Sequence, residues 1–472
     1  MDTKKLRQKI LDLAIHGKLV PQDSNDEPAS VLLERIRAEK ERLVKEGKIK
    51  KSKASKTSDT PHYENVPFEV PSSWEWTTVE NICSKIGSGS TPKGSNYAPD
   101  GILFFRSQNV YNDGVVLEDI KYISEEVHQS MIGTEVLPND LLLNITGGSL
   151  GRCAIVPNEI DRGNVSQHVC ILRPIIIKPE YLHTFILSSF FTKTMKITGS
   201  GREGLPKYNL EKMLLPVPPL EEQTRIIHEL NKWNDWVIAI DNNQQDLVET
   251  IKQTKSKILD LAIHGKLVPQ DENDEPASEL LKRINPNAEI TCDNGHYQNL
   301  PSGWAICKLS DLCKIENGFA FSSNDYKTEG TPLVRISNIV NNSIDLTECV
   351  YIQNKTDDRF IVAKGDLLIA MSGATTGKMG VYSYEGTSYL NQRVANIRIL
   401  DDSILLASYR DYFMQSKVEE ILKLAYGGAQ PNISANVIGN FDFLLPPLGE
   451  QERIVSAVRK TFAQLDAIME SL

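Results

Sequence analysis

The chain repeats part of its own sequence after 248 residues. Ile10–Asp23 returns unchanged as Ile258–Asp271, and Asn25–Ser30 returns as Asn273–Ser278. This interval is far longer than the roughly 20–50 residues of solenoid repeats. The sequence therefore predicts two halves, each of which carries one globular domain and one helical arm.

Weaker similarity extends the duplication through the rest of the chain. The offsets drift between 225 and 230 residues, and most residues between the matched positions differ. This pattern indicates that the two halves share one backbone arrangement but differ in most of the residues that it carries. The matched positions are Pro71–Trp74 and Pro301–Trp304, Arg106 and Arg335, Asn109 and Asn338, Asp140–Leu142 and Asp366–Leu368, Gly147 and Gly373, Gly151 and Gly377, Gln167 and Gln392, and Pro218–Gln223 and Pro446–Gln451.

Composition bounds the class of protein. The chain has 472 residues, enough for two to four domains that each bury a core. It contains no run of 18 apolar residues and begins with a charged segment, which predicts a soluble cytoplasmic protein. Seven cysteines without a Cys-x-x-Cys pair indicate buried, reduced thiols and no zinc site.

The net charge of −10 is unfavourable for binding nucleic acid. Residues 71–215 hold 13 Lys and Arg against 15 Asp and Glu, and residues 301–445 hold 13 against 16. Any DNA binding must therefore depend on local clusters and on partner subunits. The basic run Lys45–Lys56 follows an expected helix end, where it forms either a solvated linker or an arm that contacts phosphates.

Apolar residues alternate at steps of four and three along a central segment, which is typical of a coiled coil. They predict one helix over about Glu221 to Ile263, long enough to hold two globular domains apart by up to about 60 Å. Polar Gln244 and Thr254 interrupt the seam. The seam residues are Ile226, Leu230, Trp233, Val237, Ile240, Leu247 and Ile251 in the centre, Ile454, Val458, Leu465 and Ile468 at the C-terminus, and Leu6, Ile10 and Leu13 at the N-terminus.

The two ends of the chain together match the central helix. The repeat places Leu472 at the level of Gln244 and Met1 at the level of Glu249, so only residues 245–248 lack a counterpart. We therefore expect a long antiparallel coiled coil between two globular domains, with a pseudo-two-fold axis and adjacent termini. The alternative is a pair of helices that packs inside one large core.

Each globular segment predicts an α+β domain. Short β-like runs such as Leu103–Phe105 and Pro332–Val334 precede the apolar runs that follow Asp140 and Asp366. One amphipathic helix then closes each segment, over about Pro179–Ile197 and Ser403–Leu424.

A glycine loop follows each apolar run. Gly147–Arg152 and Gly373–Lys378 both end in a cation. The second lacks the spacing of a phosphate-binding P-loop, because three residues instead of four separate its glycines and Met379 follows the lysine. Two interpretations remain open: a polar turn that touches phosphates or base edges, or a plain tight turn between strands.

Two catalytic interpretations are weaker. Asp100, Asp119 and Lys121 follow the order of a metal-dependent endonuclease triad, but the second half has no lysine at the matching position. The chain has no Asn-Pro-Pro-aromatic motif for methyl transfer to an amino group. His16 and His264 lie near expected helix ends, where capping or packing is their expected role.

The whole chain resembles the specificity subunit of a type I restriction-modification system. Pro216–Ile227, Leu445–Ile454 and the twice-used segment Ile10–Gln22 carry this resemblance. It implies two target-recognition domains on a coiled-coil spacer, which read a bipartite, asymmetric site in double-stranded DNA. The expected domains are a helical arm with linker at 1–60, recognition domains at 61–216 and 297–445, a helical spacer at 217–296 and a C-terminal helix at 446–472.

The resemblance also implies a subunit without catalysis of its own. Two methyltransferase subunits would dock on the helical arms, and restriction (translocase) subunits would join them. S-adenosylmethionine, ATP and Mg would be bound only by these partners, so the chain itself needs no cofactor. Rival hypotheses are a nuclease and a protein-only scaffold.

Polar loop residues are the expected DNA contacts, because base readout needs a few well-placed donors. In the first half they are Lys93, Arg106, Thr146, Ser149, Arg152, Gln167, His168, Arg202 and Lys207. In the second half they are Arg335, Ser372, Thr375, Thr376, Lys378, Gln392, Arg393, Gln430 and Asn432.

Overall fold

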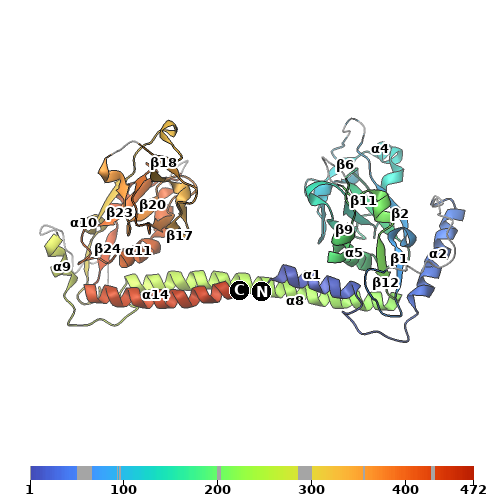
Figure 1. Ribbon diagram of the computed structural model, residues 1–472, viewed down its shortest axis with the longest axis horizontal. Helices are drawn as coiled ribbons and strands as arrows, with labels where there is room; N and C mark the ends of the chain where they lie inside the picture. The colour runs from blue at the N-terminus through green and yellow to red at the C-terminus, as the bar shows by residue number, and fades with distance from the viewer. Residues whose placement is uncertain are drawn as a thin grey trace. The chain divides into compact units, whose positions relative to one another are not determined.

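A helix of 44 residues, α8 (Leu220–Ile263), occupies the centre of the chain in the computed structural model (Figure 1). It confirms the central helix predicted from the alternating seam. The structure describes residues 2–49, 66–92, 94, 97–198, 204–284, 300–353, 357–426 and 431–472. Contacts divide the chain inside α8 into two compact units, residues 1–243 (unit 1) and residues 244–472 (unit 2).

Unit 1 is α+β, as expected. Its strands are β1 (Glu75–Thr78), β2 (Cys83–Ser88), β3 (Ile102–Phe105), β4 (Val110–Tyr111), β5 (Gly114–Val115), β6 (Lys121–Ile123), β7 (Glu135–Val136), β8 (Leu141–Asn144), β9 (Cys153–Ile155), β10 (Gly163–Val165), β11 (Val169–Pro174) and β12 (Leu214–Val217). Its helices include α1 (Thr3–Ile15), α2 (Ala29–Lys45), α3 (Val79–Ile82), α4 (Glu125–Ser130), α5 (Pro179–Leu187), α6 (Ser189–Thr194) and α7 (Lys207–Glu211), and its short 3-10 turns include η2 (Ser107–Asn109), η3 (Ile132–Thr134) and η4 (Gly147–Ser149).

Unit 2 repeats this plan. Its strands are β13 (Ala305–Lys308), β14 (Cys313–Asn317), β15 (Thr331–Val334), β16 (Ile339–Val340), β17 (Asn342–Ile344), β18 (Val350–Ile352), β19 (Ile361–Val362), β20 (Leu367–Ala370), β21 (Met379–Val381), β22 (Ser388–Leu390), β23 (Val394–Ile399) and β24 (Asp442–Leu445). Its helices include α9 (Ala277–Ile284), α10 (Leu309–Leu312), α11 (Ala407–Ser416), α12 (Val418–Ala425), α13 (Ala435–Gly439) and α14 (Leu448–Ser471), and its 3-10 turns include η5 (Ser323–Asp325), η6 (Ile336–Asn338) and η7 (Asp358–Phe360).

Each unit contains a central sheet and a peripheral sheet. In unit 1 the strand orders are β2-β11-β8-β9 and β6-β3-β10-β7. In unit 2 they are β14-β23-β20-β21-β17-β16 and β18-β15-β22-β19. The peripheral sheets share one pattern, in which a parallel pair, β3–β10 or β15–β22, has an antiparallel neighbour on each side.

The apolar runs after Asp140 and Asp366 form the buried strands β8 and β20. Leu141 and Leu143 join the core beneath the helices of unit 1, whereas Leu142 joins a second cluster toward the peripheral sheet. Strand β20 alternates in the same way between two clusters of unit 2. Successive side chains of a strand point to opposite faces, so one apolar run supplies two cores. Every cluster draws its residues from one unit, contrary to the alternative of one large core.

The single amphipathic helix predicted at the end of each globular segment is wrong, because each is divided in two. Ser188 separates α5 from α6 with an extended backbone, and its hydroxyl accepts a hydrogen bond from the backbone N–H of Phe191 at 3.3 Å. Lys417 ends α11 before α12 begins. A serine that caps a new helix is a local alternative to continuing the old one.

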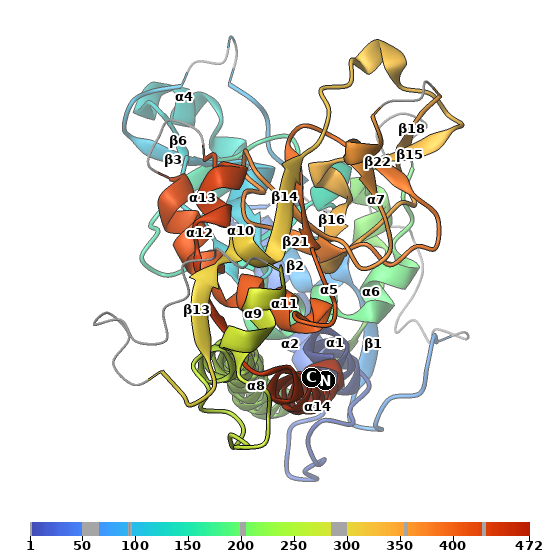
Figure 2. The ribbon, with the colours of Figure 1, turned by 90° about the vertical axis from the view of Figure 1, so that its left-hand side faces the viewer.

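In unit 2, α14 runs beside the C-terminal part of α8 (Figures 1 and 2). Gln244 Nε2 donates to the carbonyl of Leu472 at 2.8 Å, which matches the register that the repeat predicts for these two residues. Lys255 forms an ion pair with Asp466. From Gln244 to Lys255 the residue numbers rise along α8, whereas those of their partners fall from Leu472 to Asp466 along α14. The two helices therefore run in opposite chain directions.

In unit 1, α1 contacts the N-terminal part of α8. Arg7 forms an ion pair with Asp241 at 3.0 Å. In the repeat, Arg7 corresponds to Lys255. Lys255 likewise forms an ion pair with a carboxylate on a neighbouring helix, Asp466 of α14. Residues that correspond in the repeat therefore have matching roles, although they do not contact each other.

Burial along the predicted seam varies with position. Ile226, Val237, Ile251, Ile454 and Val458 are buried, and Leu230, Trp233, Ile240 and Leu465 are partly buried. Leu247 and Ile468 depart from the expected burial, with 38% and 45% of each residue exposed. Leu247 belongs to residues 245–248, the stretch for which the repeat offers no counterpart.

The repeated motifs build the same buried polar cluster in both units. Trp74 Nε1 donates to Glu222 at 2.9 Å, and the equivalent Trp304 donates to Glu450 at 2.9 Å. Burial raises the pKa of both carboxyl groups. Equivalent arginine–aspartate pairs, Arg225–Asp26 and Arg453–Asp274, lie beside them, each with an N–O distance of 2.6 Å. The repeated sequences therefore hold the helical arms to the globular parts.

Gly17 and Gly265 occur in the repeated segment because nothing larger fits. Their φ angles are +66° and +65°, in the left-handed region that favours glycine. A Cβ at either position would lie within 2.5 Å of Pro71 or Pro301. The preceding histidines cap their helices, as expected: His264 Nδ1 lies 2.7 Å from the carbonyl of Asp260, and His16 makes the same contact with Asp12.

Candidate nucleic-acid interface

The glycine loops are hairpin turns at one end of each central sheet. Gly151 N–H donates to the carbonyl of Asn144 at 2.9 Å, which closes the turn between β8 and β9. Gly377 makes the same bond to Ala370 between β20 and β21. The four loop glycines at matched positions, Gly147, Gly151, Gly373 and Gly377, have φ angles between +73° and +87°, which explains their recurrence. The loops are tight turns between strands, which is the geometry that both interpretations require.

The turn that follows β10 joins the glycine loop of unit 1. Ile145 N–H donates to the carbonyl of His168 at 3.0 Å, and Thr146 Oγ1 lies 2.8 Å from His168 Nδ1. Thr91 Oγ1 lies 3.4 Å from Gln167 Oε1. Thr146, Gln167 and His168, all predicted as DNA contacts, therefore come together although they lie in different parts of the sequence.

Arg106 reaches the same end of the fold because β3 and β10 are parallel neighbours. Ser166 N–H donates to the carbonyl of Phe105 at 2.9 Å, so the turns after the two strands lie side by side. The Asn109 side chain accepts from Arg106 N–H at 3.1 Å and fixes the turn. Asn144 Nδ2 donates to the carbonyl of Ser107 at 2.9 Å and ties this turn to the glycine loop.

Unit 2 assembles the same loops with different side chains. Asn391 N–H donates to the carbonyl of Val334 at 3.0 Å, and Met371 N–H donates to the carbonyl of Arg393 at 2.9 Å. Asn338 accepts from Arg335 N–H at 3.0 Å, as Asn109 does in unit 1. Ser372 forms a β-bridge with Asn432, which adds a further segment to the cluster. We call these matched sets the loop clusters of units 1 and 2.

In the described parts of the globular segments, the arginines without a carboxylate partner lie in the loop clusters. Nine arginines are described in residues 71–215 and 301–445, and five of them pair with carboxylates. Among the described residues, the other four have no carboxylate partner, and the sequence had predicted all four as DNA contacts. They are Arg106, Arg152, Arg335 and Arg393.

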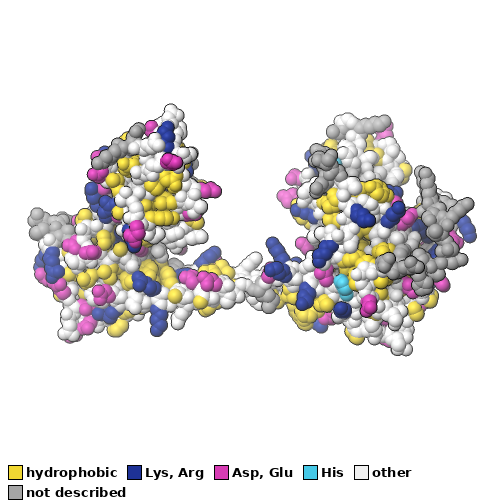
Figure 3. All heavy atoms as spheres, in the orientation of Figure 1, with side chains coloured by type: hydrophobic (Ala, Val, Ile, Leu, Met, Phe, Trp, Pro, Cys, Tyr) yellow, Lys and Arg dark blue, Asp and Glu magenta, His cyan; other side chains and the backbone are white. Residues whose placement is uncertain are grey.

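Three matched positions in each loop cluster carry a cation or a titratable nitrogen base. Arg106 and Arg335 are identical, Arg152 is replaced by Lys378, and His168 is replaced by Arg393. Arg152 lies over the ring of Tyr111 at 4.9 Å. On the face drawn in Figure 3, acidic and basic side chains are intermixed over each globular part. The charge pattern is therefore local, as an acidic chain that binds DNA requires.

The remaining predicted contacts differ in accessibility. Gln167, Gln392 and Asn432 are exposed, whereas Ser149, Ser372 and Thr375 are partly buried. Thr376 is buried, and its hydroxyl donates to the carbonyl of Gly373 at 2.7 Å, which holds the glycine loop in shape. Lys207 begins α7 and pairs with Glu211 at 3.3 Å. Lys93, Arg202 and Gln430 lie outside the described residues.

Phe319 is a member of the unit 2 loop cluster that the sequence analysis missed. It follows β14 and forms a β-bridge with Asn391, and 42% of the residue is exposed. The turn around Asn317-Gly-Phe was visible in the sequence. An aromatic residue next to a strand is ordinarily assigned to the core, and only tertiary structure shows that this one reaches the surface.

Of the three residues of the nuclease hypothesis, only Lys121 lies in a strand, whereas Asp100 lies in a bend and Asp119 in a turn. Lys121 lies in β6, and Asp119 precedes it with a φ of +54° and a backbone carbonyl that accepts from Arg106 at 2.8 Å. Across the described ranges, no group of three or more His, Cys, Asp or Glu side chains could hold a metal ion. Six cysteines are described, all with free thiols, and five are buried. No described helix is long and apolar enough to cross a membrane.

Comparison with known proteins places the chain in a family. The model of the type I restriction modification DNA specificity domain matches residues 71–250 and 301–471. The specificity subunit of the type I restriction enzyme EcoAI from Escherichia coli is 30% identical, over 96% of this chain and 88% of that protein. The EcoEI specificity subunit, also from Escherichia coli, is 28% identical over 99% and 90%.

Solved structures agree in fold. The crystal structure of the HsdS subunit from Thermoanaerobacter tengcongensis has a TM-score of 0.51 at 20% identity, over 86% of this chain and 93% of that one. A chain from a structure of type I R-M complex assembly has a TM-score of 0.56 at 19% identity, over 86% and 94%. Taken with the family model and the relatives, these matches establish that the chain belongs to the specificity subunits of type I restriction-modification systems, the subunits that recognise DNA.

Proposed function

We propose that the two globular parts read the two halves of a bipartite, asymmetric target in double-stranded DNA. Residues 71–215 would read one half-site and residues 301–445 the other. The observation that supports this proposal is the pair of matched loop clusters. Each cluster holds arginine, lysine or histidine side chains at three equivalent positions. Because side chains at two of the three positions differ between the clusters, their half-sites differ.

The identical and the changed positions have different tasks in this proposal. Contacts to phosphates position a protein without reading sequence, whereas contacts to base edges specify the target. Identical, equivalently placed side chains such as Arg106 and Arg335 suit phosphates, which are the same in every half-site. The changed pairs Arg152 and Lys378, and His168 and Arg393, suit base edges, where arginine, lysine and histidine make different patterns of hydrogen bonds.

Alanine variants of the identical pair separate these two tasks. Arg106→Ala and Arg335→Ala should each weaken binding on every sequence and lower the salt dependence of log K by about 0.9. Lys378→Arg, which copies the side chain of unit 1, should instead change the preferred bases of one half-site. Binding titrations at several salt concentrations on matched and mismatched duplexes measure both effects, and a changed preference in Arg335→Ala would contradict the assignment.

The chain would act through partners. The identical segments Ile10–Asp23 and Ile258–Asp271 suit two copies of one methyltransferase subunit, which would also supply phosphate contacts that this acidic chain lacks. Restriction subunits would join the methyltransferase complex. S-adenosylmethionine, ATP and Mg would belong to these partners, and the specificity subunit would have no catalytic activity of its own.

The helices would set the distance between half-sites. In this proposal α14 and α1 follow each other along α8 as one antiparallel coiled coil, with the termini adjacent and a pseudo-two-fold axis between the units. The hydrogen bond from Gln244 to Leu472 and the ion pair of Arg7 with Asp241 support it, each within its own unit. Four residues inserted after Gln244 add roughly 6 Å and should lengthen the recognised gap by one or two base pairs.

Segment exchange tests the central proposal. A chain with residues 71–215 taken from a relative is reconstituted with its methyltransferase subunit, and methylated adenines are mapped across a genome. We expect one half-site to change while the other half and the gap stay constant. Simultaneous change of both half-sites would contradict the division between units, and DNA cleavage by the isolated chain would favour a nuclease instead.

A further inference from the structure

Phe319 lies among the expected base-reading residues of unit 2. Its N–H donates to the carbonyl of Leu390 at 2.8 Å, and its carbonyl accepts from Gln392 N–H at 2.9 Å. These bonds pair Phe319 with the turn that carries Gln392 and Arg393, both exposed. The aromatic ring therefore emerges from the loop cluster itself.

The ring is held in one place. A Cβ on the preceding Gly318 would lie 2.2 Å from the carbonyl of Leu390, so the chain passes the turn more closely than any larger residue allows. Ring centroids of Phe321 and Phe360 lie 4.9 Å and 5.3 Å from that of Phe319. Both neighbours pack against the ring, while 42% of Phe319 stays exposed. The exposed part is a small, rigid apolar surface.

Only one apolar group lies on the edges of the bases in the major groove, the 5-methyl group of thymine. Insertion of the ring between base pairs, where apolar wedges partly unstack a base step, is less suited to this side chain because Phe321 and Phe360 pack against it. Phe319 would have to leave Phe321 and Phe360 to do so. We propose that Phe319 contacts a thymine methyl group and specifies a T·A pair in the half-site of unit 2. This inference depends on the proposed division of the target between the units.

Unit 1 has a different residue at the matched position. Ser90 follows Gly89 as Phe319 follows Gly318, and Gly89 also passes within contact of the neighbouring strand, with its added Cβ 1.7 Å from the carbonyl of Val165. Ser90 is exposed and presents a hydroxyl group instead of a ring. The glycine and its close approach to the neighbouring strand are thus shared, while the exposed side chain that follows changes from polar to apolar.

Uracil in place of thymine tests the contact directly, because it removes the methyl group and keeps the base pair. The target is first mapped with the wild-type methyltransferase complex, and each thymine of the unit 2 half-site is then replaced in turn. One replacement should weaken binding about fourfold, the effect of about one buried methyl group. The Phe319→Ser complex should bind the thymine and uracil duplexes equally and should accept other base pairs at that position.

Leu400→Ser is the matched control, because Leu400 is 50% exposed and follows the opposite end of β23 from Arg393. This variant should keep the uracil effect. Equal uracil sensitivity in wild type and Phe319→Ser would overturn the inference, as would a half-site without any T·A pair. Weaker binding by Phe319→Ser without any uracil effect would indicate a wedge instead. Failure of segment exchange to assign this half-site to residues 301–445 would contradict the proposed function independently.

Discussion

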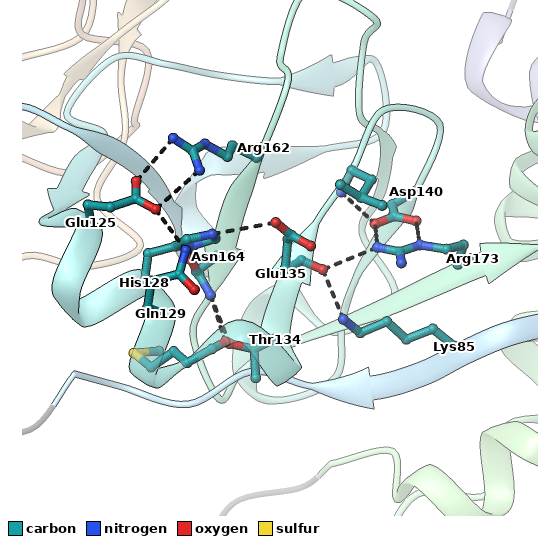
Figure 4. Close-up of polar contacts among 12 residues, drawn as sticks. Lys85, Glu125, His128, Gln129, Thr134, Glu135, Asp140, Arg162, Asn164 and Arg173 are labelled. Carbon is teal, nitrogen blue, oxygen red and sulfur yellow. Dashed lines mark hydrogen bonds and ion pairs between the residues drawn. The ribbon is translucent and has the colours of Figure 1, made fainter. Parts of the chain in front are cut away.

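The two peripheral sheets have the same strand order but opposite interiors. In unit 1, β6-β3-β10-β7 encloses a polar network, in which His128 Nδ1 lies 2.5 Å from Asn164 Oδ1 and His128 Nε2 lies 3.4 Å from Glu135 Oε1 (Figure 4). Asn164 Nδ2 also donates to Thr134 Oγ1 at 3.0 Å. Figure 4 shows how these side chains point toward one another from α4, β7 and β10.

Unit 2 fills the matching sheet with aromatic residues. Tyr389 stands where β10 has Asn164, and its ring lies 5.8 Å from that of Phe321. Phe319 and Phe360 continue the cluster to the surface. Polar and aromatic interiors can occupy one strand frame because backbone hydrogen bonds, and not side chains, define the sheet. The difference teaches that the strand arrangement specifies where a loop lies. The side chains packed on the sheet decide which side chains that loop can carry.

The largest expected effect comes from breaking the polar interior. Asn164→Ala should lower the free energy of unfolding of unit 1 by about 2–3 kcal/mol, because it leaves Nδ1 of buried His128 without a hydrogen-bond partner. Phe321→Leu in unit 2 should cost about 1 kcal/mol, since packing partners can readjust around an apolar side chain. Hydrogen exchange on the full chain, followed in peptides from each unit, measures both. Equal costs would show that the polar interior is no more demanding than the aromatic one.

The repeated polar cluster should respond equally in both units. Glu222→Gln and Glu450→Gln should each cost about 1–2 kcal/mol, because a carboxamide places N–H groups against a donor, Trp74 or Trp304. The exposed neighbour Glu221→Gln serves as the control and should have no measurable effect. Urea denaturation gives the values. A large difference between the two variants would mean that the matched clusters contribute unequally to the free energy of unfolding.

A smaller effect should distinguish the two glycine loops. Thr376→Val removes the hydroxyl that donates to Gly373 and should cost about 1 kcal/mol in unit 2. Unit 1 has Leu150 at the matched position and holds its loop without this bond. If the loop then moves, methylation should weaken at one half-site only, which genome-wide mapping can detect. Unchanged stability and unchanged methylation would show that the hydroxyl is dispensable.

The smallest effect is a difference in pH dependence at one helical position. His183 of α5 and Asp411 of α11 are equivalent, and burial lowers the pKa of His183 and raises that of Asp411. A lowered histidine pKa means that unit 1 loses stability as pH falls below about 6.5, where the unfolded chain takes up the proton first. A raised aspartate pKa means that unit 2 loses stability as pH rises above about 3.8.

His183→Gln should remove the first of these trends. Urea midpoints of wild type and variant are compared between pH 7.5 and pH 5.5. The difference between the two proteins should shift in favour of the variant at the lower pH. A difference that stays constant with pH would mean that His183 does not titrate in this range.

Much of the fold followed from local patterns. The alternating seam predicted α8 nearly to its ends, the alternating apolar runs predicted β8 and β20, and the glycines predicted the turns that follow them. These features depend on short-range periodicity and backbone conformation, which are properties of neighbouring residues. The break at Ser188 was missed, because a capping hydrogen bond competes with helix continuation only by a small free energy.

The sequence by itself determined that this protein has two equivalent halves, a long central helix and the family to which it belongs. It also determined which arginines to suspect, since Arg106 and Arg335 recur at matched positions. Only tertiary structure decided that four described arginines of the globular segments lack carboxylate partners, that Thr376 is buried and that Phe319 is exposed. The physical reason is distance along the chain. Pairing of charges and burial of side chains depend on strands such as β3 and β10, which lie far apart in sequence and meet only when the sheet forms.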